Sequence, residues 1–484
     1  MVLTPASVRA AVLEQTERTR HCSKVDIQRF IEESESNIIS LDSKISSLIE
    51  LRDSQRACVL ALRYIISPIR TLPVELLAEI FDLTVENHTH VDDAHRISQV
   101  CSYWRRVAHS TPRLWTRRLA VDLREKDFAD ELKTWLARSA PLPLPIAFVP
   151  VTEAIDPDIL EAVLKDAPRF SSLEMVPMDT MPSSLVRRVG QCRLHNLVEL
   201  NLVGTIEDDD TDTTPLSFIA VPRLRKLRIS LESTAPQPIL PWAQLTNLTV
   251  NGASPDVTFG ILSQCTSLLQ AAVVIPGWPP LPEIKHSILI FNQLHTLVLH
   301  FMEFIETSED IASFFDCLST PLLRDLELVF MPVQWPQTHF TAFQLRAPTI
   351  TQLKFTYSES LTSDDVVAAI RNSPSLTHLK INYCDECFDD AFIRTLHYED
   401  GVEPLVPHLQ DLSFWSDKAN FTEDVLAGMI ASRWWSDTEL ASKATPPAVT
   451  RWAHVEFDIE DYEWGPHFMD MLKVIPSDVL RVVF

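Results

Sequence analysis

The chain has 484 residues, of which 46% are apolar and only eight are glycine, and its formal net charge at pH 7 is −24. Phosphate-cradling loops need glycine so that the backbone can approach the ligand, and no GxGxxG, GxxxxGK[ST], GxSxG or HExxH motif occurs. The acidic surplus lies in residues 151–484, which hold 22 basic and 46 acidic side chains. Such a surface repels phosphate backbones, so we expect no nucleic acid partner.

The cysteine pattern and the apolar segments predict the compartment. Eight cysteines are scattered along the chain, which is typical of a reduced, intracellular protein. The first thirty residues contain no apolar signal segment, and no window approaches 18 uncharged apolar residues. We therefore expect the cytoplasm, the nucleus or both, and no membrane partner.

Residues 1–66 are predicted to form an N-terminal helical domain. Between residues 24 and 66, apolar residues recur at alternating steps of three and four, which is typical of a coiled coil. They are Ile27, Ile31, Ile38, Leu41, Ile45, Leu48, Val59, Leu62 and Ile66, with Ser34, Arg52 and Gln55 interrupting the series. Two interpretations stay open: a homodimer through residues 24–66, or docking of this stripe on the following domain.

Residues 67–120 form the next predicted unit. The segment TLPVELLAEIFDL, residues 71–83, predicts an amphipathic helix with Pro73 in its first turn, where the missing N–H costs nothing. Its apolar face carries Leu72, Leu76, Ile80 and Leu83. We expect a polar loop over residues 86–95 and a second amphipathic helix over RISQVCSYWRRVAHS, residues 96–110, followed by PRLW.

The order LPVELLAEIF, SQVCSYWRRVA and PRLW resembles the F-box, a three-helix motif that binds the Skp adaptor of cullin-RING ubiquitin ligases. The resemblance, together with the helical pattern, implies adaptor contacts at Leu72, Pro73, Leu76, Leu77, Ile80, Val100 and Trp104. Trp104, like Trp115, also suits the core of the motif itself. A unit of about 50 residues buries little surface, and docking in a partner's groove would cover so wide a stripe. The alternative is that these side chains are ordinary internal core.

Residues 166–484 repeat the unit apolar-x-x-apolar-x-apolar. Copies begin at residues 170, 197, 224, 245, 268, 294, 323, 350, 376 and 409, and WAHVEF at 452 is a candidate terminal copy. The spacing resembles that of leucine-rich repeats, which stack parallel strands into a solenoid with outer helices. The asparagine or cysteine usual in that family occurs only as Cys384, so we expect an irregular open arc of α+β or α/β class, with residues 121–165 as connector and cap.

In such a solenoid the x positions of every strand face the same side and form a lane across the repeats. The predicted target-binding residues in this lane are Lys226, Arg228, Asp325, Glu327, Lys354, His378, Lys380 and Trp415. Their order predicts an acidic middle between two positive flanks. The alternative is a solvated face without a ligand.

No catalytic residue, metal or cofactor is expected. The segment CDEC, residues 384–387, has the spacing of zinc ligands but lacks a second pair. An F-box followed by such repeats resembles the F-box/leucine-rich-repeat substrate receptors of fungi. The resemblance implies a non-enzymatic substrate-recognition subunit of an SCF-type ubiquitin ligase, which binds a Skp-family adaptor, through it a cullin, and an unknown protein target. The alternatives are a non-ligase repeat scaffold that self-associates through the N-terminal coil, and a hydrolase whose site comes from distant residues.

Overall fold

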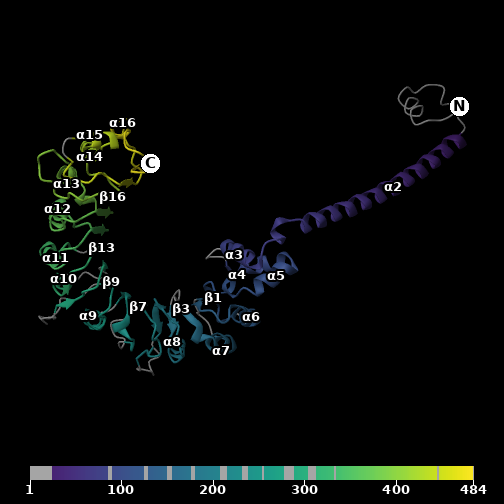
Figure 1. Cartoon of the computed structure of the whole chain (residues 1–484), viewed down its shortest axis with the longest axis horizontal. Coiled ribbons are helices and arrows are strands. Elements are labelled where there is room, and N and C mark those ends of the chain that lie inside the picture. Colours follow the sequence, from purple (N-terminus) through teal and green to yellow (C-terminus); the bar gives the residue numbers. More distant parts are fainter. Residues whose placement is uncertain are drawn as a thin grey trace. The chain divides into compact units, whose positions relative to one another are not determined.

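The computed structural model describes residues 24–85, 90–124, 129–149, 155–175, 180–207, 215–231, 238–252, 255–276, 288–302, 312–331, 334–443 and 446–482 (Figure 1). The chain forms two compact units, Met1–Leu83 and Thr84–Phe484. The boundary falls inside the segment 67–120 that the sequence groups as one domain. No described helix is long and apolar enough to cross a membrane.

The first unit contains a long helix, α2 (Lys24–Ile65), a short 3-10 turn, η2 (Pro68–Arg70), and α3 (Val74–Thr84). The long N-terminal helix predicted over residues 24–66 is confirmed. It runs for 42 residues because its sequence contains neither glycine nor proline, the two residues that weaken or stop a helix. None of its residues is buried.

The second unit opens with α4 (His90–Val100), α5 (Ser102–His109) and η3 (Pro112–Trp115). The single helix predicted over residues 96–110 is wrong in two respects: α4 already begins at His90, inside the expected loop, and the helix breaks at Cys101. Cys101 is extended, with φ −162° and ψ 169°, and its Sγ accepts a 3.4 Å hydrogen bond from the backbone N–H of Trp104. It therefore caps α5 and satisfies one of the free N–H groups of the first turn. Residues 86–89 of the expected loop lie outside the described residues.

Trp115 belongs to the core, as the sequence suggests. It is fully buried, and its indole Nε1 donates a 2.8 Å hydrogen bond to the carbonyl of Ala108. Its ring meets Trp135 of α6 (Ala129–Ser139) edge-on, with 4.8 Å between ring centroids, and the Arg138 guanidinium lies 4.6 Å from the ring centroid. These contacts join η3 to the helix that precedes the repeats.

Within the described residues, a parallel sheet of 14 strands forms the main body of the second unit, and it is open, with β1 and β18 at its two edges. All eleven repeat segments of the sequence are strands in it, so the predicted α/β solenoid is confirmed. The strands, in spatial order, are β1 (Leu119–Val121), β2 (Leu144–Phe148), β3 (Phe170–Met175), β5 (Glu199–Leu202), β7 (Lys226–Ser230), β8 (Asn247–Asn251), β9 (Gln270–Pro276), β11 (Thr296–Met302), β13 (Asp325–Met331), β14 (Gln352–Thr356), β15 (His378–Asn382), β16 (Asp411–Ser416), β17 (His454–Ile459) and β18 (Leu480–Val482).

The sheet begins earlier and ends later than the repeat pattern predicts. β1 lies within the segment assigned to the F-box, and β2 lies within the connector 121–165. Neither strand carries the full apolar-x-x-apolar-x-apolar unit, so the repeat pattern alone does not reveal them. They nevertheless pair in parallel, with Leu119 beside Ile146, and extend the same core.

Helices follow one face of the sheet (Figure 1). They are α7 (Pro157–Lys165), α8 (Ser183–Gly190), α9 (Pro255–Gln264), α10 (Ala312–Asp316), α11 (Gln337–Gln344), α12 (Ser363–Arg371), α13 (Asp390–Leu396), α14 (Glu423–Ser432), α15 (Asp437–Ser442) and α16 (Pro466–Leu472), with 3-10 turns η5 (Ala167–Arg169), η6 (Trp242–Gln244) and η7 (Asp385–Cys387). Two minor parallel pairs join β4 (Thr180–Pro182) to β6 (Thr205–Glu207) and β10 (Leu289–Ile290) to β12 (Leu318–Ser319).

The core lies between the sheet and these helices. Alternate residues of each strand are buried there, as for Leu326 and Leu328 of β13, and each such side chain contributes about 1.5–3 kcal/mol when it leaves water. Aromatic rings continue from repeat to repeat: Phe301 stacks on Phe330 with 5.1 Å between ring centroids. The solenoid is therefore held by contacts between neighbouring repeats.

Cys384 occupies the position that asparagine or cysteine holds in regular leucine-rich repeats. It is fully buried, and its Sγ accepts a 3.3 Å hydrogen bond from the backbone N–H of Ser358 in the preceding repeat. Cys387 is also buried, and its Sγ donates to the Cys384 carbonyl at 3.2 Å. The CDEC segment thus links two repeats.

Candidate functional site

The helix α3 presents a continuous apolar face to solvent. Leu76, Ile80 and Leu83 are 52%, 37% and 85% exposed, and the spacing of four and three residues places them on one side of the helix. Leu72 is half-buried and Pro73 exposed just before the helix begins. We call these five residues the α3 face. Apolar side chains this exposed and this close together are typical of an interaction site.

One expected contact residue does not belong to this face. Leu77 is fully buried, as are Ala78 and Phe81, because positions 77, 78 and 81 lie on the opposite side of the helix. The sequence places Leu77 among the adaptor contacts, but in this conformation its side chain is not accessible to a partner. Its role is to anchor α3 in the fold.

The two expected contacts outside α3 differ in exposure. Val100, the last residue of α4, is 58% exposed and available to a partner. Trp104 of α5 is half-buried. A half-buried tryptophan can serve the core with one edge and a partner with the other.

The x positions of the repeats all lie on the helix-free face of the sheet, as the sequence predicts. The strands pair in register, so equivalent residues form rows: Glu327, Lys354 and Lys380 are consecutive neighbours in one row, and Asp325, Gln352 and His378 in the next. None of the eight predicted lane residues is buried. The structure therefore brings these side chains onto one surface, which we call the lane.

Charges in the middle of the lane are paired rather than separated into blocks. Lys354 Nζ donates a 2.8 Å hydrogen bond to Glu327 Oε1 across neighbouring strands. Partial burial, and after it the Glu327 carboxylate, raises the pKa of Asp325, while Lys354, His378 and Lys380 oppose this rise. The expected acidic middle is thus partly neutralised by the lysines beside it. Burial also lowers the pKa of His300, which lies on the same face.

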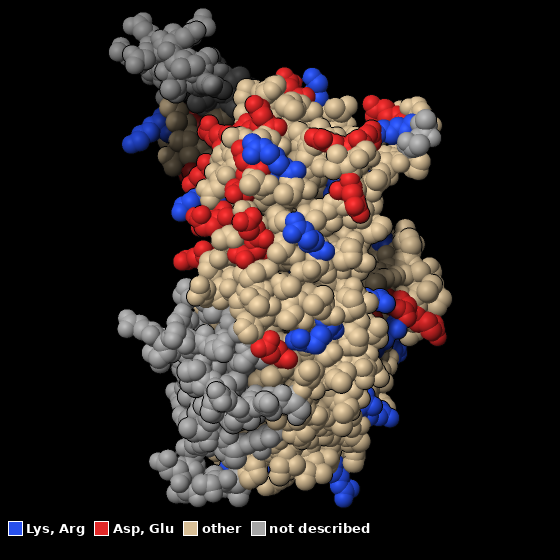
Figure 2. Space-filling view, turned by 90° about the vertical axis from the view of Figure 1, so that its left-hand side faces the viewer, with Lys and Arg blue, Asp and Glu red and all other residues tan. Residues whose placement is uncertain are grey.

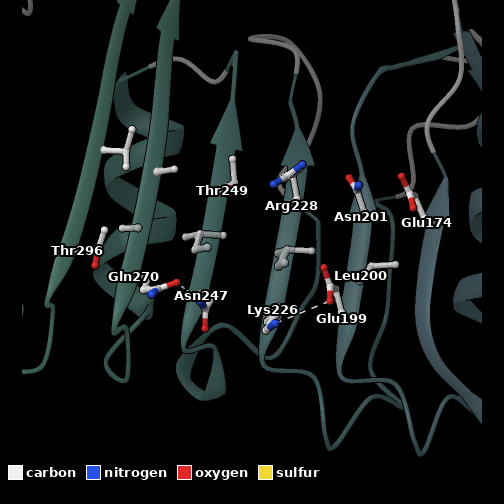
Figure 3. A pocket seen from close by; sticks show the side chains of 15 residues that line it. Glu174, Glu199, Leu200, Asn201, Lys226, Arg228, Asn247, Thr249, Gln270 and Thr296 are labelled. Atoms are coloured by element: carbon white, nitrogen blue, oxygen red, sulfur yellow. Dashed lines mark hydrogen bonds and ion pairs between the residues drawn. The ribbon is translucent and has the colours of Figure 1, made fainter. Parts of the chain in front are cut away.

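A pocket of about 480 Å³ lies in the N-terminal part of the lane, over strands β3 to β11 (Figure 3). Lys226 Nζ is 3.9 Å from Glu199 Oε2, and Asn247 donates a hydrogen bond to the Gln270 side chain. Within the described ranges Arg228 forms no ion pair, so its guanidinium is the most available cation of this pocket. A pocket of this volume is in the range that holds a small ligand or a few side chains of a protein.

Glu174 of β3 also lines this pocket and was missed by the sequence analysis. Its carboxylate pairs with Arg118. The signal was present in the sequence, because Glu174 is the third x position of FSSLEM, the first repeat copy.

Two exposed tyrosines extend the lane at the C-terminal ends of its strands. Tyr357 follows β14 and Tyr383 follows β15, and their rings stack in parallel with 4.9 Å between centroids. The backbone N–H of Tyr383 donates to the carbonyl of Trp415, whose side chain is 39% exposed. The matching endings LKFTY and LKINY carry this signal in the sequence. Exposed tyrosine and tryptophan are enriched where proteins bind one another.

The surface charge of the second unit is uneven. Asp and Glu side chains gather over the C-terminal repeats in the upper half of Figure 2, whereas Lys and Arg are spaced singly. This distribution agrees with the acidic surplus of residues 151–484. Such a surface attracts basic partners and repels acidic ones.

The segment that contains α3 matches a known protein family. Residues 69–120 match the F-box-like family. This segment is an F-box-like domain. The match covers α3, α4, α5 and η3, and so includes both the α3 face and the buried Trp115. No curated protein matches the chain.

Solved structures give distant matches. A chain of the Drosophila Toll–Spätzle complex is 12% identical, with a TM-score of 0.33, and the match covers 72% of this chain but only 44% of that one. A leucine-rich-repeat protein of Leptospira interrogans is 14% identical, with a TM-score of 0.29, and the match covers 78% of this chain and 97% of that one.

Proposed function

We propose that the protein is the substrate-recognition subunit of an SCF-type ubiquitin ligase. Its F-box-like domain docks on a Skp-family adaptor and through it on a cullin, and its repeat solenoid binds a protein target. The observation that carries the proposal is the exposed α3 face within the segment that matches the F-box-like family.

An exposed apolar helix face suits the groove of a partner. Leu76 and Ile80 lie at i and i+4, the spacing at which anchors of a docked helix enter a groove. Pro73 adds a rigid apolar contact without leaving an unsatisfied N–H, because it precedes the first turn. The target would lie on the lane, where paired charges, the Arg228 guanidinium and exposed aromatic rings give polar specificity beside apolar contact area.

In this role the chain itself carries out no chemistry. It raises the effective concentration of its target near the enzyme that transfers ubiquitin, which is catalysis by positioning. We propose that this activity takes place in the cytoplasm or nucleus, because the scattered cysteines are typical of a reduced, intracellular protein.

Binding of a purified Skp-family adaptor to the full chain tests the proposal. The wild-type chain should bind, and the variant Leu76→Asp with Ile80→Asp should not, because two carboxylates in an apolar groove would be buried without partners. The matched control is Glu75→Gln, which alters the same turn of α3 outside its apolar face. Failure of the wild-type chain to bind, or undiminished binding by the double variant, would refute the proposal.

A non-ligase scaffold is the second candidate, and the helix α2, none of whose residues is buried, favours it. In that case the chain would self-associate and bind its partners without recruiting an adaptor. Immunoprecipitation of the tagged chain from cells separates the two: co-purification of a cullin that depends on Leu76 and Ile80 supports the receptor, and its absence supports the scaffold.

A further inference from the structure

The helix α2 carries a seam of apolar side chains, all of which are exposed to solvent. The nine seam residues from Ile27 to Ile66 are between 40% and 77% exposed. A helix alone in water is marginally stable, and most of its stability in a protein comes from packing such a stripe against another element. A 42-residue helix with a heptad seam and no buried residue therefore needs a partner helix.

The heptad assignment identifies the seam positions. Counting from Ile31 as position a, the a positions are Ile31, Ile38, Ile45, Arg52, Val59 and Ile66, and the d positions are Ile27, Ser34, Leu41, Leu48, Gln55 and Leu62. Nine of these twelve positions are apolar. The same surface on a second copy is complementary to it, because knobs from one helix fit the holes of an identical helix.

Charge decides the direction in which two copies pair. In a parallel pair, Arg52 would face the partner's Arg52 in the seam, which buries two like charges together. The flanking g and e positions would bring Phe30 to Glu35, Lys44 to Ile49 and Leu51 to Arg56, and none of these pairs has opposite charges. A parallel pair is therefore electrostatically unfavourable.

An antiparallel pair removes the conflict. With Ile45 of one copy opposite Leu48 of the other, Arg52 lies opposite the partner's Leu41 and beside its Asp42. The e positions then bring Glu35 to the partner's Arg56 twice by symmetry, and the g positions bring Phe30 to Ile65. The acidic first half of α2 thus lies along the basic second half of its partner. Arg56 lies only 3.9 Å from Asp53 within its own helix, an exposed pair that is weak enough to exchange.

We propose that residues 24–66 of two copies of this chain pair as an antiparallel coiled coil. The dimer carries two α3 faces and two lanes, so a target with two matching sites would bind with avidity. The pairing rests on α2 alone and does not depend on adaptor binding. Its failure and the failure of the proposed function are therefore separate outcomes.

Sedimentation velocity on the full chain tests for the dimer. The wild-type chain should be dimeric at micromolar concentration, and Ile45→Asp should raise the dissociation constant by about 100-fold or more, because it buries a carboxylate against the partner's Leu48 in the seam. Ser43→Asp is the matched control, two residues away at an outward f position, and should leave the dimer intact. A monomeric wild-type chain, or a dimer that survives Ile45→Asp, overturns the proposal.

A charge exchange tests the direction of pairing. Glu35→Arg alone should weaken the dimer by about tenfold, since two opposite-charge contacts become repulsive. Adding Arg56→Glu in the same chain should restore wild-type affinity, because each contact is rebuilt with its charges exchanged. The restoration also shows that the single variant did not simply unfold the helix. If the double variant is no tighter than the single one, the antiparallel pairing is wrong.

Discussion

Leu76 and Leu77 are neighbours in α3 but differ in exposure: the side chain of Leu76 is 52% exposed, whereas that of Leu77 is fully buried. Two leucines that look equivalent in the sequence therefore have different tasks. Leu77 holds the helix in the fold, and Leu76 is available to a partner. Because the two roles fall on different residues, mutations can test binding and stability separately.

Alanine substitution at the two positions should have opposite consequences. Leu76→Ala should weaken binding of a Skp-family adaptor by about 30-fold, the size of a strong interface contact, and change the free energy of unfolding by less than about 0.5 kcal/mol. Leu77→Ala should lower the free energy of unfolding by about 2–5 kcal/mol because it leaves a cavity. Adaptor titration and urea unfolding measure the two effects. Equal loss of stability in both variants would contradict the assignment.

The ion pair between Lys354 and Glu327 allows target recognition to be separated from folding. Lys354→Glu alone places two carboxylates side by side and should reduce both stability and target binding. Adding Glu327→Lys rebuilds the pair with reversed polarity, so stability should return while binding of a target that reads the charges stays at least about tenfold weaker. Thermal unfolding measures the stability of each variant. The amounts of protein that each variant retains measure target binding. Recovered target binding in the exchanged variant would show that the lane does not read this pair.

The carboxyl group of Asp325 should make the protein less stable at neutral pH than an amide would. Burial raises its pKa in the folded chain, so the folded state holds the proton more strongly than the unfolded state does. The free energy of unfolding then falls as pH rises from the ordinary pKa of about 4 through the raised one. Asp325→Asn should therefore raise the melting temperature at pH 7, and this gain should disappear as the pH falls towards 4. A melting difference that is independent of pH would contradict the raised pKa.

Glycine 190 is required where α8 ends. A Cβ at Gly190 would lie 2.4 Å from the carbonyl oxygen of Ser217, so Gly190→Ala must displace backbone and should cost about 1–3 kcal/mol. Gly428, inside α14, has open space around it, and Gly428→Ala should stabilise the chain by up to about 1 kcal/mol because alanine favours a helix. Denaturant midpoints of the two variants should therefore move in opposite directions.

The repeat strands were readable from the sequence because their signal is local. A strand alternates its side chains between two faces, so LRDLEL or LTHLKI reveals both the buried leucines and the lane residues between them. The long helix and the F-box-like segment were readable for the same reason, since their apolar spacing spans only a few turns. The strands β1 and β2 could not be predicted in this way because they lack the repeat unit, and only the pairing of β1 with β2 and of β2 with β3 makes them part of the sheet.

By itself, then, the sequence determined the period of the long helix, of α3 and of the repeat strands, and with it the fold class and the face on which each lane residue lies. The tertiary structure decided which side of α3 is buried, where the helix breaks at Cys101, and which charges pair across neighbouring strands, as Lys354 and Glu327 do. The physical reason is the range of the interactions involved. Periodicity follows from backbone geometry over a few residues, whereas burial and ion pairing depend on groups that folding brings together from distant parts of the chain.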